Sequence, residues 1–88
     1  MERRRFTGTL EHADDGGHWV VVPFDGKAAF GQARAPVKGT LNGTPFAGRL
    51  AVYGGRTYLG LRAEIRRAAG IEDGDSVDVV LELDEERR

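Results

Sequence analysis

Cysteine is absent from this 88-residue chain, and its absence excludes disulfides, thiolate metal sites and cysteine nucleophiles. Long apolar runs are absent as well, since the longest covers residues 19–22 (WVVV), far short of the ~20 residues of a membrane span. A secretory signal requires an apolar segment after its basic start, and no such segment follows the basic start of this chain. We therefore expect a cytoplasmic protein that has no membrane segment.

Residues that commonly carry catalysis are scarce. Ser76 is the only serine, and no Gly-x-Ser-x-Gly nucleophile elbow surrounds it. The thirteen glycines form neither a Gly-x-Gly-x-x-Gly dinucleotide fingerprint nor a Walker loop. The acid pairs Asp14/Asp15 and Asp73/Asp75 fall in turns, where solvated carboxylates lack the contrasting environments of an acid–base pair. We therefore predict no catalytic residues and no cofactor.

The two histidines, His12 and His18, flank a turn signal at residues 14–17 (DDGG). Their imidazoles are expected to face each other, with Asp14 and Asp15 between them. Two imidazoles and a carboxylate are suitable ligands for a divalent metal, but this spacing matches no zinc motif. The sequence therefore predicts solvent-exposed turn histidines and no metal site.

The formal net charge of −1 conceals a strong asymmetry along the chain. Residues 27–67 hold eight of the thirteen Lys and Arg residues and only one acid, Glu64, whereas residues 68–88 hold eight acids. Two interpretations remain open: the acidic end neutralises the basic middle within the fold, or the basic middle forms a face that meets an anionic partner. Arginine outnumbers lysine eleven to two, which favours bidentate contacts to carboxylate or phosphate.

Alternating apolar side chains between short turn signals predict a β-rich chain. The turn signals include residues 42–43 (NG), the strongest hairpin signal present, and residues 54–55 (GG). Between two of the strands, Asp25 is expected to cap a helical turn through residues 27–30. The six expected strands cover residues 6–11, 18–22, 37–41, 46–52, 57–61 and 77–83.

One principal helix is expected over residues 62–69, and Gly70 follows it where a left-handed C-cap belongs. Arg62 and Arg66 share one face of this helix at i, i+4 spacing. The helix is therefore expected to bury one face and to expose its arginines. Its apolar stripe comprises Leu61, Ile65, Ala68 and Ala69.

A sheet of six short antiparallel strands has two exposed edges unless it closes. We therefore predict an all-β fold with one short helix: a small closed six-stranded antiparallel barrel, capped by the 62–69 helix. The alternative is an open sheet with the helix packed on one face, which is an α+β arrangement. Residues 1–84 are expected to form a single domain and residues 85–88 a frayed charged tail.

The aromatic side chains have two expected roles. Tyr53 and Tyr58 flank the second glycine turn, where exposed rings beside Arg56 could stack on bases as in single-strand binders. Small barrels also hold one ligand at an end, and Trp19, Tyr58 and Arg66 are the candidates for lining such a pocket. The residues that alternation assigns to the core are Phe6, Trp19, Val21 and Phe46.

Four segments follow one another in a characteristic order: residues 19–23 (WVVVP), 36–43 (PVKGTLNG), 65–68 (IRRA) and 74–79 (GDSVDV). In this order and spacing the chain resembles, over nearly its whole length, a small bacterial family of domains of unknown function, DUF1905. One departure is the Gly-Leu pair at residues 60–61, where the family often has Leu-Pro before the helix. The resemblance implies a closed six-stranded barrel and supplies no catalytic residues, and some relatives carry the domain beside one associated with bacteriocin resistance.

Residues 65–79 are also similar to the second half of the swapped-hairpin domains of AbrB-type transcription regulators, which bind DNA as intertwined dimers through basic residues. Our first hypothesis is a non-enzymatic binding module, a monomer or homodimer that recognises an anionic ligand or protein partner through an arginine-rich face. The alternatives are an AbrB-like DNA-binding regulator and an enzyme acting on a small molecule. The candidate ligand-binding residues are Trp19, Arg56, Tyr58, Arg62, Arg66 and Arg67.

Overall fold

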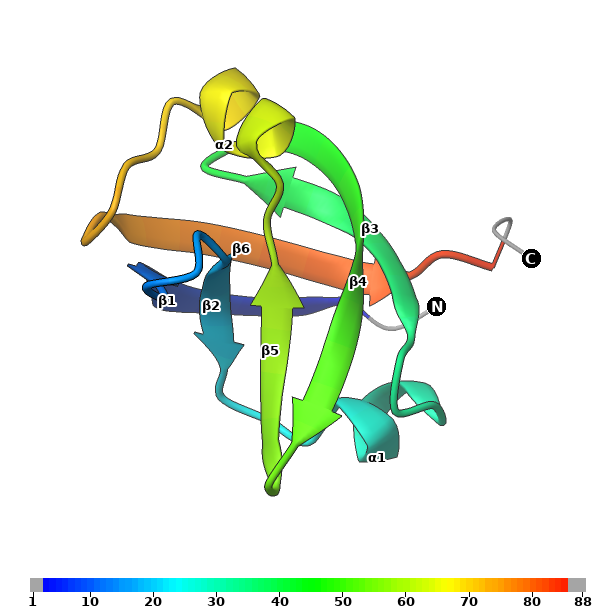
Figure 1. Ribbon diagram of the computed structural model, residues 1–88. Coiled ribbons are helices and arrows are strands. Elements are labelled where there is room, and N and C mark those ends of the chain that lie inside the picture. The colour runs from blue at the N-terminus through cyan, green and yellow to red at the C-terminus, as the bar shows by residue number, and fades with distance from the viewer. Residues whose placement is uncertain (1–2, 86–88) are drawn as a thin grey trace.

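The computed structural model describes residues 3–85, which form six strands and two short helices (Figure 1). The strands are β1 (Arg4–His12), β2 (His18–Val22), β3 (Pro36–Leu41), β4 (Thr44–Tyr53), β5 (Arg56–Gly60) and β6 (Ser76–Leu83). The helices are α1 (Gly26–Phe30) and α2 (Ala63–Ala69). Each predicted strand is present, with ends that differ from the prediction by two residues or fewer. Most of the expected tail, residues 86–88, lies outside the described residues.

The six strands close into a barrel in the order β1-β2-β5-β4-β3-β6, and every neighbouring pair is antiparallel. Closure comes from the pairing of β1 with β6, which runs from Arg4 opposite Leu81 to Thr9 opposite Ser76. Each strand formed by residues 3–85 therefore has two neighbours, although residues 4–9 of β1 pair only with β6 and residues 44–49 of β4 pair only with β3. The predicted closed barrel is confirmed, and the open sheet is excluded.

Aliphatic side chains fill the inside of the barrel. One face of each strand points inward, and Phe6 and Phe46 pack against this interior as partly buried residues. Burial of so much apolar surface is the main source of stability in a domain of this size. The most deeply buried side chains are Leu10, Val20, Val37, Leu41, Leu50, Leu59, Val77, Val79 and Leu81.

The orientation of β2 corrects one sequence-based prediction. Val20 and Val22 face the interior, so the assignment of Trp19 and Val21 to the core is wrong. The strand is apolar on both faces, and a shift of one residue exchanges the two faces completely. Alternation alone therefore could not show which face of this strand turns inward.

Helix α2 lies across one end of the barrel, as predicted (Figure 1). It ends at Gly70, whose φ of 68° is left-handed and costs glycine nothing. Ile65 and Ala69 pack against the core at i, i+4 spacing. Ala68 is exposed, so its assignment to the apolar stripe is wrong, because the helix contacts the barrel through a narrower row.

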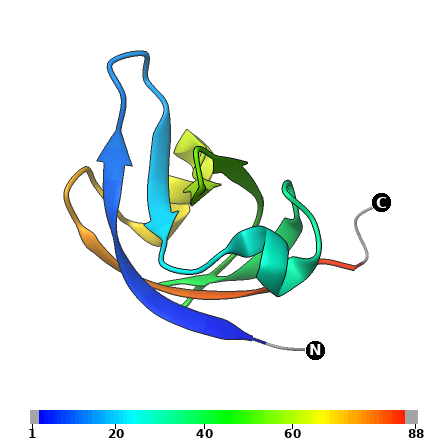
Figure 2. The same ribbon diagram turned by 90° about the horizontal axis from the view of Figure 1, so that it is seen from below.

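Figures 1 and 2 place the short helix α1 near the opposite end of the barrel. Asp25 caps it as predicted, since its Oδ1 accepts hydrogen bonds from the backbone N–H groups of Lys27 (3.0 Å) and Ala28 (3.3 Å). The N–H of Gly26 donates to the hydroxyl of Thr57 on β5 at 2.9 Å, which ties α1 to the barrel. Neither helix in the described part of the chain is long and apolar enough to cross a membrane.

Candidate functional site

The carboxylates of β6 pair with the start of the chain and not with its basic middle. Asp78 accepts two hydrogen bonds from Arg5 on β1, at 2.9 and 3.2 Å. These bonds and the negative charge of Asp78 raise the pKa of the Arg5 guanidinium above its ordinary value. Glu82 lies 3.8 Å from Nε of Arg3. Within residues 3–85, none of the eight Lys and Arg residues of segment 27–67 forms an ion pair with a carboxylate.

Barrel closure separates the acidic and basic parts of the chain in space. In the order β1-β2-β5-β4-β3-β6, strand β6 lies across the barrel from β5. The acidic side chains Asp78 and Glu82 belong to β6, whereas Arg49 belongs to β4, beside β5. The barrel therefore has one wall on which the carboxylates of β6 are paired with Arg3 and Arg5 and, away from it, a wall on which arginines remain without carboxylate partners.

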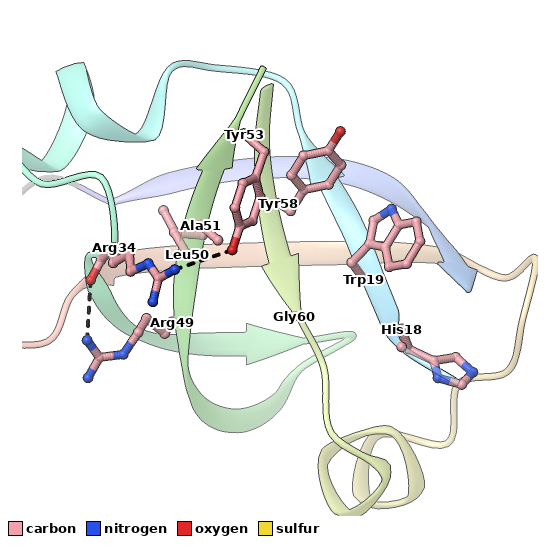
Figure 3. Close-up of a pocket in the computed structure, with 10 residues that line it drawn as sticks. His18, Trp19, Arg34, Arg49, Leu50, Ala51, Tyr53, Tyr58 and Gly60 are labelled. Atoms are coloured by element: carbon pink, nitrogen blue, oxygen red, sulfur yellow. Dashed lines mark hydrogen bonds between the residues drawn. The ribbon is translucent and has the colours of Figure 1, made fainter. Parts of the chain in front are cut away.

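A surface hollow of about 550 Å³ lies on this second wall, over β2, β5 and β4. Its three aromatic rings come from three neighbouring strands: Trp19 from β2, Tyr58 from β5 and Tyr53 from β4 (Figure 3). The ring centroids of Trp19 and Tyr58 are 6.1 Å apart, and those of Tyr53 and Tyr58 are 6.4 Å apart. We call these three side chains the aromatic shelf. Tyr53 is 59% exposed, and it is the one large hydrophobic side chain within residues 3–85 that is mostly exposed to solvent.

The period of two residues along each strand dictates the outward position of the shelf. Val20 faces the interior on β2, so its neighbour Trp19 faces outward. Leu59 faces the interior on β5, so Tyr58 faces outward. Leu50 faces the interior on β4, so the residues that alternate with the interior positions, Arg49, Ala51 and Tyr53, lie on the outer face of that strand.

Two arginines border the aromatic shelf (Figure 3). Arg34 precedes β3, and its Nη2 donates a long hydrogen bond of 3.4 Å to the hydroxyl of Tyr53. Arg49 donates from Nη1 to the backbone carbonyl of Arg34 at 3.5 Å. These contacts hold both guanidinium groups beside the rings while leaving most of their donors available. The first hollow therefore combines apolar rings with two positive charges.

A second hollow of about 690 Å³ adjoins the first and extends to α2. The two hollows share Gly17, His18, Arg49 and Gly60, and we call them together the aromatic–arginine groove. The second hollow adds Arg62 and Arg66, together with one acid, Glu64. Nε of Arg66 donates to the carbonyl of Leu61 at 3.1 Å, which fixes the position of this side chain against the end of β5.

Glycine makes the junction of the two hollows open. Gly60 lines both of them, and a Cβ placed on Gly60 would meet no atom within 4 Å. A side chain at this position would therefore project into the groove without disturbing the barrel. Glycine in a strand commonly marks such a place, where a ligand or another backbone approaches closely.

The structure brings four of the six predicted binding residues into this groove. Trp19 and Tyr58 lie on the outer wall of the barrel and Arg66 lies on α2 at its end, whereas the sequence predicted one pocket at the end of the barrel for all three. Arg56 and Arg67 are exposed but line neither hollow, and Arg67 borders a separate hollow on the far side of α2. The four residues in the groove are Trp19, Tyr58, Arg62 and Arg66.

The two arginines of the first hollow, Arg34 and Arg49, were not among the binding residues predicted from the sequence. Arg49 could have been found, because it alternates with Ala51 and Tyr53 on one face of a predicted strand. Arg34 carries no such signal, since it lies in the link between α1 and β3, whose path depends on tertiary packing.

The two histidines face each other at the end of the β1–β2 hairpin, with ring centroids 5.7 Å apart. Asp73 lies between them: its Oδ2 is 3.0 Å from Nδ1 of His12, and its Oδ1 is 3.0 Å from Nε2 of His18. The predicted pairing is thus present, but the carboxylate comes from the loop before β6 and not from Asp14 or Asp15. No group of three or more such side chains within residues 3–85 is arranged to hold a metal ion. The cluster joins two loops and fixes His18 at the rim of the groove.

Comparison with known proteins identifies the family but no activity. The family model for a domain of unknown function, DUF1905, matches residues 6–81, which covers the barrel from β1 into β6. No curated protein matches the chain. Since the matched segment is most of the sequence, the chain belongs to the DUF1905 family.

Proposed function

We propose that this domain is a non-enzymatic binding module that recognises an anionic ligand or partner through the aromatic–arginine groove. The observation that carries the proposal is the pairing of charges. The acids of β6 pair with Arg3 and Arg5, so the arginines that line the groove remain available to an external anion. Unpaired guanidinium groups that surround a hollow raise the local concentration of anions and bind carboxylate or phosphate in bidentate fashion.

A binding role also agrees with the interior of the barrel, which is filled by aliphatic side chains. An enzyme with an internal substrate cavity would need space there. In the described residues, the hollows that could accept a ligand lie on the outside. We place the protein in the cytoplasm under the same proposal, since a chain without cysteine requires no oxidising compartment.

The AbrB-like alternative requires an intertwined dimer, in which strands are exchanged between two chains. All six strands described here pair within one chain in a closed ring, so an exchange of strands would have to break pairs that a single copy already makes. The closed barrel therefore supports the binding module over this alternative. A gel-shift titration with duplex DNA at two salt concentrations tests it, because phosphate contacts produce a steep salt dependence.

Retention on heparin–agarose tests the proposal with a generic polyanion as the probe. The variant Arg49→Ala/Arg62→Ala/Arg66→Ala removes three charges from the groove. The control Lys27→Ala/Lys38→Ala/Arg67→Ala removes the same charge from positions outside it. The groove variant should elute at clearly lower salt than the control, with both folds checked by circular dichroism. If the two variants elute together, only net charge matters and the proposed site is wrong.

A further inference from the structure

The aromatic–arginine groove contains two kinds of group that recognise different parts of one ligand. The rings of the aromatic shelf are inclined to one another, by 90° between Trp19 and Tyr58 and by 46° between Tyr53 and Tyr58, so each offers its own face, on which one planar group can stack. Arg34 and Arg49 beside the shelf offer guanidinium groups, which match the geometry of phosphate. A ligand that satisfies both carries flat rings and negative charges close to one another. Nucleic acid has this combination of groups along its whole length.

The shape of the groove favours a single strand over a duplex. A protein reads duplex DNA by inserting a protruding helix or ribbon into the major groove. The site described here is a hollow, with Gly17 and Gly60 at its centre. In an unpaired strand, moreover, the faces of the bases are accessible for stacking on protein rings. The indole N–H of Trp19 and the hydroxyl of Tyr58 have no hydrogen-bond partner within residues 3–85. Both groups can therefore form hydrogen bonds with the edges of bases.

The size of the groove accommodates more than one nucleotide. Each of its two adjoining hollows lies within the ~300–1,000 Å³ of a complete small-molecule site. Basic side chains occur along the whole path: Arg34 near the shelf, Arg49 at the junction, and Arg62 and Arg66 near α2. Glu64 is the one acid among the lining residues, and the acidic strand β6 lies on the opposite wall.

We propose that the aromatic–arginine groove binds a short single strand of nucleic acid, whose bases stack on the aromatic shelf while its phosphates contact Arg34 and Arg49. This inference rests on the proposed function, because it names the ligand of the same groove. The arginines supply the salt-dependent part of the affinity. The rings supply a part that tolerates different base sequences, since every base has a π-face.

Trp19 provides a direct readout, because it is the only tryptophan in the chain and belongs to the shelf. The probe is a labelled oligothymidylate of about eight nucleotides, within the ~4–16 nucleotides that one small barrel domain accommodates. Its addition should quench the fluorescence of Trp19 saturably and raise the anisotropy of the labelled strand. A duplex of the same length should bind at least about tenfold more weakly, since its bases are not available for stacking.

Variants of the groove distinguish stacking of bases on the rings from electrostatic attraction to the arginines. Gly60→Val adds a side chain at the junction of the hollows, where a Cβ meets no other atom, and it should weaken binding at least about tenfold, with its fold checked by circular dichroism. Tyr58→Ala should weaken binding by about tenfold through the lost ring, whereas Tyr58→Phe should stay near wild type. Lys38→Ala, outside the groove, should change the affinity far less than Arg49→Ala. Arg49→Ala should also reduce the slope of log K against log[salt] by about 0.7.

Each outcome decides between the two proposals. If the oligonucleotide neither binds nor quenches Trp19 at low salt while heparin retention still depends on the groove arginines, the nucleic-acid assignment is wrong and the anion-binding function stands. Binding that is unchanged in Gly60→Val and in Tyr58→Ala, or equal affinity for the duplex, likewise overturns the assignment. If heparin retention does not depend on the groove arginines, both proposals fail together.

Discussion

The seam between β3 and β6 depends on a glycine, and replacing it tests the description of the barrel. Gly39 lies on the inward face of β3, between the buried residues Val37 and Leu41. A Cβ at Gly39 would overlap the carbonyl oxygen of Val80 and lie 2.7 Å from its carbonyl carbon. Comfortable contacts between heavy atoms are ~3.5–4.0 Å, and the overlap with the oxygen is larger than that with the carbon, so β3 and β6 must separate by well over ~1 Å to accept one methyl group.

The size of the effect follows from what this separation disrupts. Overpacking in a well-packed region costs about 1–3 kcal/mol. Each ladder hydrogen bond that is weakened costs about 1 kcal/mol more, and β3 pairs with β6 over only five residue pairs, from Val37–Leu83 to Leu41–Val79. We expect Gly39→Ala to lower the free energy of unfolding by about 3 kcal/mol. In a domain of this size that loss corresponds to a decrease in Tm of about 12–24 °C.

Urea unfolding followed by circular dichroism measures this difference. Gly60→Ala is the matched control, because it adds the same methyl group to another strand glycine, where a Cβ meets nothing within 4 Å. The control should stay within about 0.5 kcal/mol of wild type or gain slightly, since alanine reduces the freedom of the unfolded chain. If Gly39→Ala unfolds within about 1 kcal/mol of its control, the close approach of β3 to Val80 is wrong.

Two further predictions concern turns and caps. Asn42 has a φ of 49°, and its Oδ1 accepts a hydrogen bond of 2.8 Å from the N–H of Asp78; Asn42→Ala should therefore cost about 1–3 kcal/mol in urea unfolding. Asn42→Gly, which tolerates that φ, should recover part of the loss, and equal stability of the two variants would contradict the backbone argument. Asp25→Ala should cost about 1 kcal/mol by removing the cap of α1, whereas Asp25→Asn should remain close to wild type. A thermal melt in which both Asp25 variants match wild type would show that the cap contributes nothing.

Local chemistry explains why the number of strands and the turns could be predicted. Turn positions with positive φ accept few residues other than glycine and asparagine. The Asn-Gly pair at residues 42–43 and Gly70 after α2 are such positions. Asp25 likewise satisfies backbone donors within three residues of itself. Barrel closure followed from a similarly simple requirement, because six short strands otherwise leave two unpaired edges.

The outward position of Trp19 could not be predicted from local sequence. Residues 19–22 are apolar on both faces, so only the partners β1 and β5 decide which face is buried. The buried face of α2 could not be predicted in full for the same reason, because only the contact of the helix with the barrel leaves Ala68 exposed. Each of these errors concerns the direction of a side chain in an element whose existence was predicted correctly.

By itself the sequence determined the local elements, the need for closure and the uneven distribution of charge, because each depends on neighbouring residues or on composition. The tertiary structure alone decided which charges meet. It paired Arg5 with Asp78, far apart in the chain, and so left the arginines between them without carboxylates. It also brought Trp19, Arg34 and Tyr58 into one groove, since strand order in a barrel depends on long-range pairing that no local pattern encodes.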